Sequence, residues 1–262
     1  MAEIILYLLT GAVAGVSAGL LGIGGGLIIV PILFFVFSAQ PVSPDHVMHM
    51  ALATSLATII VTSASSAWAH HKHRAVLWPV VFDLSPGIFI GALLGVMLAS
   101  VLASDVLRPV FAVFELTVAL HLLLNYKPGT HSTSISRISS ITGGVVIGSI
   151  SSLVGVGGGT LTTPFLLWHN IAIRNAVASS AACGFTIAVA GTAAYVITGW
   201  NTEGLPAYTF GFVNLPAFAI IIMTSMVTAP AGASLAHRLP EKTLRLFFGI
   251  FLLMLSLTML LD

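Results

Sequence analysis

The stretch LLGIGGGLIIVPIL, from Leu20 to Leu33, decides the fold, because it recurs as LVGVGGGTLTTPFL from Leu153 to Leu166. Seven of the fourteen positions are identical, and these include all four glycines and the proline. Glycine and proline both weaken helices, yet each copy lies inside an otherwise apolar run. The recurrence of the same helix-breaking residues inside two apolar segments indicates that the break has a structural role.

The composition of the chain places it in a membrane. Of its 262 residues, 57% are hydrophobic and 6% are charged, whereas soluble domains carry roughly 25% charged residues. This predicts a multi-pass protein of the plasma (inner) membrane, with the lipid bilayer as its partner. The net charge of +1 gives no indication of a nucleic-acid partner. The single cysteine, Cys183, excludes a disulfide framework within the chain.

The apolar segments predict an all-α polytopic membrane protein. They cover residues 4–22, 26–38, 47–69, 76–102, 107–125, 138–154, 160–171, 175–199, 211–236 and 244–261. Most approach or exceed the roughly 20 residues that a membrane span needs. The segments after the glycine clusters, 26–38 and 160–171, are shorter, so the sequence leaves open whether they are re-entrant or fully spanning.

The repeat extends beyond the glycines and divides the chain into two homologous halves, residues 1–127 and 128–262. Residues 51–58, ALATSLAT, align with residues 176–183, AVASSAAC. The polar stretch 125–136 is the expected linker. Each half then holds one glycine-broken segment and about three full transmembrane helices, and the halves together form one transport domain.

The basic residues indicate that the two halves have opposite orientations. If each glycine-broken segment crosses the membrane once, four of the nine Lys and Arg residues fall on one side and five on the other. If each broken segment enters and returns, or crosses twice, eight fall on one side and only Arg108 on the other. Cytoplasmic loops are enriched in Lys and Arg, which favours the second arrangement. It predicts inverted repeats, with the loops 70–74, 125–136 and 237–242 cytoplasmic and both termini outside.

Inverted repeats with broken helices are typical of transporters that bind a substrate near the bilayer midplane. The amides at the start of a half-helix attract an anion, and successive glycines let the backbone approach it. We therefore expect the tips around Gly24–Gly26 and Gly157–Gly159 to meet and bind a small anionic substrate. A nucleotide-binding loop is not expected, because no lysine follows the glycines and no βαβ pattern flanks them.

Other glycines have a simpler explanation. Gly11 and Gly15 are four residues apart, as are Gly144 and Gly148 at the matching places in the second half. Small residues with this spacing let two membrane helices pack closely. We expect these four glycines to be packing residues rather than part of the site.

The duplicated motif G-x-G-G-G-x-x-x-x-P, followed in each half by A-x-A-T-S or A-x-A-S-S, resembles the sulfite exporter TauE/SafE family of membrane permeases. The resemblance covers nearly the whole chain. It implies export of small sulfur-containing anions, such as sulfite or organosulfonates like sulfoacetate. Carried over residue by residue, it gives the motif prolines Pro31 and Pro164 and these substrate-binding candidates: Gly22, Gly24, Gly25, Gly26, Thr54, Ser55, Gly155, Gly157, Gly158, Gly159, Ser179 and Ser180.

The second half is expected to supply more hydroxyl donors than the first. Thr160, Thr162 and Thr163 replace the apolar residues at the matching places in the first tip. Of these three we count Thr160, next to the glycines, among the substrate-binding candidates.

Glu115 is the candidate for coupling transport to protons. It lies in the middle of the segment 107–125, where an ionisable group is costly and suggests a function. Together with inverted repeats, it predicts a secondary active, proton-coupled transporter that works by alternating access. A protonated or hydrogen-bonded structural glutamate is the other explanation, and the sequence leaves both open.

The sequence HHKHR, His70–Arg74, invites a metal site. Adjacent histidines on a short loop seldom form one without carboxylate or cysteine partners. A basic cytoplasmic turn near anionic headgroups explains it better, with Trp68 and Trp78 as interfacial residues. We therefore expect no metal and no cofactor.

Alternative functions remain. The nearest is a permease for another small anion or metabolite. A remote one is an intramembrane serine hydrolase, because GVSAG (Gly15–Gly19) satisfies the G-x-S-x-G motif, although that motif needs a strand-to-helix turn. No enzymatic activity is expected. The sequence leaves the exact substrate, the direction of transport, the coupling ion and the oligomeric state open, and a homo-oligomer is compatible with it.

Overall fold

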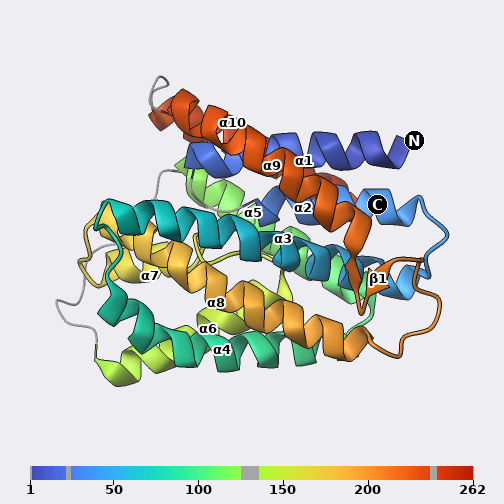
Figure 1. Ribbon diagram of the computed structural model, residues 1–262, viewed down its shortest axis with the longest axis horizontal. Helices are drawn as coiled ribbons and strands as arrows, with labels where there is room; N and C mark the ends of the chain where they lie inside the picture. Colours follow the sequence, from blue (N-terminus) through green and yellow to red (C-terminus); the bar gives the residue numbers. More distant parts are fainter. Residues whose placement is uncertain (1, 22–24, 125–135, 237–240, 262) are drawn as a thin grey trace.

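The computed structural model describes residues 2–21, 25–124, 136–236 and 241–261. They form a bundle of helices along the long axis of the molecule, with one short antiparallel hairpin (Figure 1). In chain order the elements are α1 (Ala2–Leu21), α2 (Gly26–Ser38), α3 (Pro44–Lys72), α4 (Trp78–Val101), α5 (Ser104–Leu124), α6 (Arg137–Leu153), α7 (Thr162–Trp168), α8 (Ile173–Gly199), β1 (Thr209–Phe210), β2 (Val213–Asn214), α9 (Leu215–Ala236) and α10 (Glu241–Leu261).

The expected all-α membrane protein is confirmed. Four described helices, α3, α4, α5 and α8, are long and apolar enough to cross a membrane, and α1, α2, α9 and α10 contain shorter apolar stretches. Large hydrophobic side chains such as Val101, Ile138 and Phe247 are exposed on the outer faces of the bundle. A surface of this kind is stable against lipid tails rather than water.

The helices α2 and α7 are half-helices. Their 13 and 7 residues extend about 20 Å and about 10 Å at about 1.5 Å per residue, against a hydrocarbon core of about 30 Å. Each begins at a buried residue in the interior, Gly26 or Thr162, and runs back toward the end from which the preceding helix came (Figure 1). In the described residues neither short segment spans the bundle by itself.

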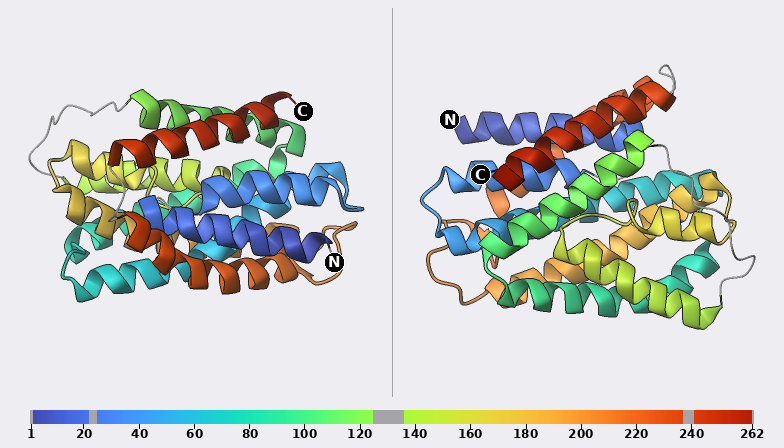
Figure 2. Two further views of the ribbon diagram at one scale, coloured as in Figure 1. Left: turned by 90° about the horizontal axis from the view of Figure 1, so that it is seen from above. Right: turned by 180° about the vertical axis from the view of Figure 1, so that it is seen from behind.

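The main helix pairs combine one helix from each half of the sequence. α1 packs along α9, and α6 packs along α4, so the first helix of each half lies against the fourth helix of the other. α3 pairs with α8, and α5 pairs with α10, as Figure 2 shows from two further sides. The two halves therefore share one core.

Glycines allow the closest of these contacts. A Cβ at Gly11 would lie 2.7 Å from the carbonyl oxygen of Ile221 on α9, and one at Gly144 would lie 2.7 Å from that of Leu84 on α4. A Cβ at the second glycine of each pair, four residues later, would lie at least as close to the backbone of the same partner helix. The expectation that these glycines are packing residues is confirmed.

The two ends of the bundle differ in charge. α1 begins and α10 ends at the same end, whereas α3 ends and α6, α8 and α10 begin at the other (Figure 1). Arg108, in the second turn of α5, is near the end that holds the termini. Six other basic residues lie in or next to helix termini at the opposite end, which we call the basic end: Lys72, Arg74, Arg137, Arg174, Lys242 and Arg245.

Parts of the predicted loops fall outside the described residues. These parts are 125–135, which is nearly the whole expected linker, and 237–240. The remaining basic residues, Lys127 and Arg238, belong to them. The cytoplasmic location of these loops stays a prediction.

Candidate substrate-binding site

The two glycine-rich tips meet in the interior of the bundle. A Cβ on Gly26, the first residue of α2, would lie 2.8 Å from the carbonyl oxygen of Gly155 and 3.0 Å from the Cα of Val156. Ile59 of α3 touches both tips, because its side chain would lie 3.2 Å from a Cβ at Gly26 and 3.3 Å from one at Gly157. Tips from opposite halves are thus in direct contact.

The first tip is described from Gly25 onward, and Gly22 and Gly24 lie outside the described residues. The carbonyl oxygen of Gly25 accepts hydrogen bonds from two amides in the first turn of α2, at 3.0 and 2.9 Å. The amides of Gly26 and Leu27 come before these two and have no acceptor within α2. Both residues are buried, so the positive end of this half-helix lies inside the protein.

The second tip has a row of amides without hydrogen-bond partners in the part of the chain that the structure describes. The amides of Gly157, Gly158, Gly159 and Thr160 donate to no other described residue. Gly157 and Gly158 are buried, and the next two residues are partly buried. A buried amide without a partner costs about 1–3 kcal/mol, so native proteins satisfy nearly all of them, with water where protein groups are lacking. This tip therefore has the capacity to bind acceptor atoms.

Gly155 gives the second tip its shape. Its φ of 66° lies in the left-handed region that favours glycine. A Cβ there would also lie 3.0 Å from the Cα of Leu52 on α3. The hydroxyl group of Ser55 donates a 2.8 Å hydrogen bond to the carbonyl oxygen of Gly155. A residue of the first half thus orients the tip of the second.

Thr54 and Ser179 occupy matching positions and make matching hydrogen bonds. The N–H of Asn214, just before α9, donates to Thr54 Oγ1 at 3.0 Å. The N–H of Leu77, just before α4, donates to Ser179 Oγ at 3.0 Å. Both hydroxyl groups belong to fully buried residues. Each therefore holds the start of the fourth helix of the opposite half.

The hydroxyl groups of Ser180 and Thr160 are also bonded within the protein. Ser180 Oγ accepts a 2.9 Å hydrogen bond from Thr163 Oγ1 and donates to the carbonyl oxygen of Val177 at 2.8 Å. Thr160 Oγ1 donates to the carbonyl oxygen of Gly157 at 3.3 Å. Their binding of a substrate stays a prediction.

Two further hydroxyl groups flank the second tip. Ser151 and Thr162 are fully buried, and their hydroxyl oxygens have no hydrogen-bond partner among the described residues. We did not count either among the site residues from the sequence. Thr162 belongs to the hydroxyl-rich run TLTT, and Ser151 belongs to SISS at the end of an apolar helix, where a polar run is a usable signal.

Glu115 is fully buried in the middle of α5, and neither carboxylate oxygen has a hydrogen-bond partner among the described residues. The helix α5 packs against α10, where a Cβ at Gly249 would lie 3.4 Å from the carbonyl oxygen of Ala119. Among the described residues, no counter-charge lies within hydrogen-bond distance of Glu115.

The alternative sites have little support. Ser17 lies inside α1, which is a helix on both sides of it, so the strand-to-helix turn of a serine hydrolase is not found at this residue. The described residues contain no group of three or more His, Cys, Asp and Glu side chains that could hold a metal ion.

Comparison with known sequences agrees with this architecture. Residues 7–259 match the family described as sulfite exporter TauE/SafE. The chain is 38% identical, over 260 residues, to a probable membrane transporter protein of Haemophilus influenzae, covering 99% of this chain and 98% of that protein. It is 27% identical, over 258 residues, to a probable membrane transporter protein of Methanocaldococcus jannaschii, covering 98% of this chain and 95% of that protein. The chain therefore belongs to the sulfite exporter TauE/SafE family and is a multi-pass membrane protein of this transporter family.

Proposed function

We propose that this protein exports small sulfur-containing anions, sulfite or an organosulfonate, and binds them where the two glycine tips meet. The observation that carries the proposal is the row of amides from Gly157 to Thr160 that donate to no other described residue. Successive backbone N–H groups in a turn form a site that suits the oxygens of an anion. Membership of the sulfite exporter TauE/SafE family supports sulfur oxyanions as the substrate class.

The first tip contributes to the same site. The first amides of α2, at Gly26 and Leu27, lie at the positive end of a half-helix that touches the second tip. Ser151 and Thr162 add hydroxyl groups that have no partner among the described residues. The other hydroxyl residues, Thr54 and Ser179, receive a positioning role in our proposal, because their oxygens already accept hydrogen bonds from the protein.

Amides and hydroxyl groups suit a transporter better than a fixed cation does. Transport requires binding that is strong enough to capture the ion and weak enough to release it. The described Lys and Arg residues lie near the ends of the bundle rather than at the tips. Partial charges therefore attract the anion, without a buried ion pair that would retain it.

The pairing of helices from opposite halves supports inverted repeats and alternating access. If α1–α5 and α6–α10 are related by a two-fold axis, the pair α1 and α9 should have an equivalent in the pair α6 and α4. Both pairs do pack together. The hydrogen bonds of Thr54 and Ser179 are equivalent in the same way. In Figure 1, α1 runs toward the basic end and α6 runs away from it. Repeats of this kind move around a fixed central site.

The position of Glu115 supports proton coupling. An ionised carboxylate without a partner is costly inside a membrane protein, whereas the neutral acid is much less so. Ionisation at this place therefore requires a change in the surroundings of the side chain. A conformational change that exposes Glu115 to one side of the membrane would supply it and move a proton.

The proposal is tested with purified protein in liposomes. Binding and uptake are measured for sulfite, sulfate, thiosulfate, sulfoacetate and taurine, with and without an imposed pH gradient. We expect sulfite or sulfoacetate to bind with or without the pH gradient. We expect it to accumulate in the liposomes only when the gradient is imposed. Binding of none of the five, together with uptake of another metabolite, would support the alternative permease.

A further inference from the structure

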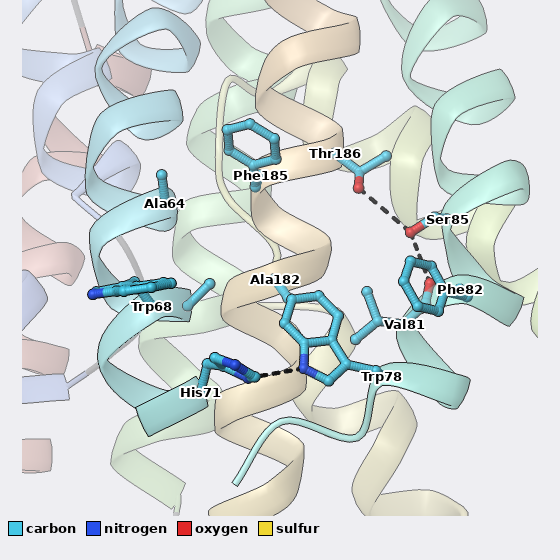
Figure 3. A pocket seen from close by; sticks show the side chains of 11 residues that line it. Ala64, Trp68, His71, Trp78, Val81, Phe82, Ser85, Ala182, Phe185 and Thr186 are labelled. Atoms are coloured by element: carbon cyan, nitrogen blue, oxygen red, sulfur yellow. Dashed lines mark hydrogen bonds between the residues drawn. The ribbon is translucent and has the colours of Figure 1, made fainter. Parts of the chain in front are cut away.

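A groove runs along the outer face of the bundle near the basic end. Its volume is about 470 Å³, within the range of about 300–1,000 Å³ that is usual for ligand sites. α3 and α4 form its two sides and α8 forms its floor (Figure 3). Aromatic side chains dominate the lining: Trp68, Trp78, Phe82 and Phe185.

The lining of this groove is apolar. The side chains of Trp68, Phe82 and Phe185 are 62%, 68% and 41% exposed. The hydroxyl group of Ser85 donates to the carbonyl oxygen of Val81 at 2.7 Å and lies 3.4 Å from Thr186 Oγ1, so it is satisfied within the protein. The groove thus offers a hydrocarbon chain a suitable surface and gives a small anion few polar groups to bind.

Cationic side chains lie at one end of the groove. His71 Nδ1 accepts a 3.0 Å hydrogen bond from Trp78 Nε1, which joins α3 to α4 at that end (Figure 3). Lys72 Nζ lies 5.4 Å from the centre of the Trp68 ring. Arg174 Nη2 donates to the carbonyl oxygen of His73 at 3.1 Å, just beyond the end of α3. The groove is therefore apolar along its length and positive at the end of α3.

We propose that this groove binds one anionic phospholipid, with an acyl chain in the groove and the phosphate at Lys72 and Arg174. The groove begins where α3 ends, at the level where interfacial tryptophans and basic residues meet headgroups. From there it runs toward the hydrocarbon core. An anionic phospholipid matches this arrangement, because its charged headgroup lies at the membrane surface and its apolar acyl chains extend from there into the core.

A second copy of the chain fits the groove less well. Two copies in one membrane share one orientation, so a symmetric pair related by a two-fold axis would bring the positive end of one groove near that of the other. The carboxylate nearest in sequence to the lining, Asp83 on α4, is not part of it. The charge at the groove therefore favours an anionic lipid.

The test is native mass spectrometry of delipidated protein in detergent, titrated with phosphatidylglycerol or with phosphatidylcholine of the same acyl chains. We expect phosphatidylglycerol to bind at least tenfold more tightly than phosphatidylcholine. The double variant Lys72→Gln/Arg174→Gln should weaken phosphatidylglycerol binding by about tenfold and phosphatidylcholine binding by much less, because the choline group offsets the charge of the phosphate. Arg108→Gln, which removes a cation at the opposite end, is the matched control and should have no effect.

A second pair of variants tests the apolar part. Ala64 lines the groove and is exposed, so the larger side chain of Ala64→Trp has room to occupy the groove. Ala193 is exposed on α8 but does not line the groove, so Ala193→Trp is the control. We expect only Ala64→Trp to weaken binding of both lipids. Equal binding of both lipids to all variants would overturn the proposal. So would a shift from dimer to monomer in Ala64→Trp, since the groove would then be a subunit interface.

Discussion

Thr54 accepts a 3.0 Å hydrogen bond from the backbone N–H of Asn214, and this bond connects the two halves of the chain. Asn214 in turn caps α9, because its side-chain oxygen accepts a 2.9 Å hydrogen bond from the N–H of Ala217. Thr54 is fully buried in the middle of α3. Its hydroxyl group therefore fixes the start of α9 against the centre of the molecule.

Replacing Thr54 by valine should destabilise the protein without affecting the site. Thr54→Val keeps the size of the side chain but leaves the N–H of Asn214 buried without an acceptor, which costs about 1–3 kcal/mol. We expect a lower melting temperature for Thr54→Val, and a value near wild type for Thr54→Ser. Sulfite affinity of the folded variant should change little. An unchanged melting temperature with weaker sulfite binding would make Thr54 a substrate ligand instead.

The charge difference between the two ends predicts which end faces the cytoplasm. His73 follows α3 at the basic end, and Glu203 lies in the exposed loop after α8 at the other. In intact cells, a thiol reagent that does not cross membranes should label Glu203→Cys, and should label His73→Cys only after permeabilisation. The native Cys183 is buried and should stay unlabelled. Labelling of His73→Cys from outside would reverse the proposed orientation.

Removing the ionisable carboxyl group of Glu115 should uncouple transport from the proton gradient. Glu115→Gln retains the shape of the side chain but cannot release a proton. In liposomes we expect it to lose accumulation against a gradient, while substrate affinity stays near wild type. Glu203→Gln, which changes an exposed glutamate in a loop, is the control. Accumulation at the wild-type rate in Glu115→Gln would make Glu115 a structural residue.

Much of the fold follows from the sequence, because hydrophobicity and helix breakers act locally. The segment 26–38 coincides with α2, and the segment 138–154 coincides with α6 within one residue at each end. The pairing of α1 with α9 could not be derived in this way. Helix partners depend on which surfaces fit together across the whole chain, and the glycines at positions 11 and 15 showed only that some helix packs closely there.

The contact between the two glycine tips was predictable from the sequence, whereas the hydrogen bonds of individual atoms around them were not. The duplicated glycines indicated that two tips meet, and Gly26 does touch Gly155. The partner of a hydroxyl group depends on tertiary contacts, so nothing in the sequence showed that Asn214 bonds to Thr54. The same holds for the hydroxyl group of Ser151: that it has no partner among the described residues follows only from the positions of its neighbours.

The structure separates two neighbouring glycines that the sequence treats alike. A Cβ at Gly158 would lie 2.5 Å from the carbonyl oxygen of Ser180 and 2.8 Å from the backbone nitrogen of Gly184. Among the residues that the structure describes, a Cβ at Gly157 would meet only the side chain of Ile59, at 3.3 and 3.9 Å. Gly158→Ala should therefore lower the melting temperature clearly, because the backbone around Ser180 and Gly184 must move to make room for the Cβ. Melting curves of the two variants in the same detergent measure this difference.

Isothermal titration of sulfite into wild-type protein and Gly157→Ala tests the anion site most directly. The substitution changes no charge and requires only a small shift of a side chain, so the melting temperature should stay within a few degrees of wild type. Losing one charge-assisted hydrogen bond costs about 1.5–3 kcal/mol, which corresponds to about ten- to a hundredfold weaker binding. We expect a loss of this size in Gly157→Ala, because the N–H groups remain but the added Cβ keeps the oxygen atoms of the anion from approaching the backbone amides of the tip. The same sulfite affinity in both proteins would contradict an anion site at the glycine tips.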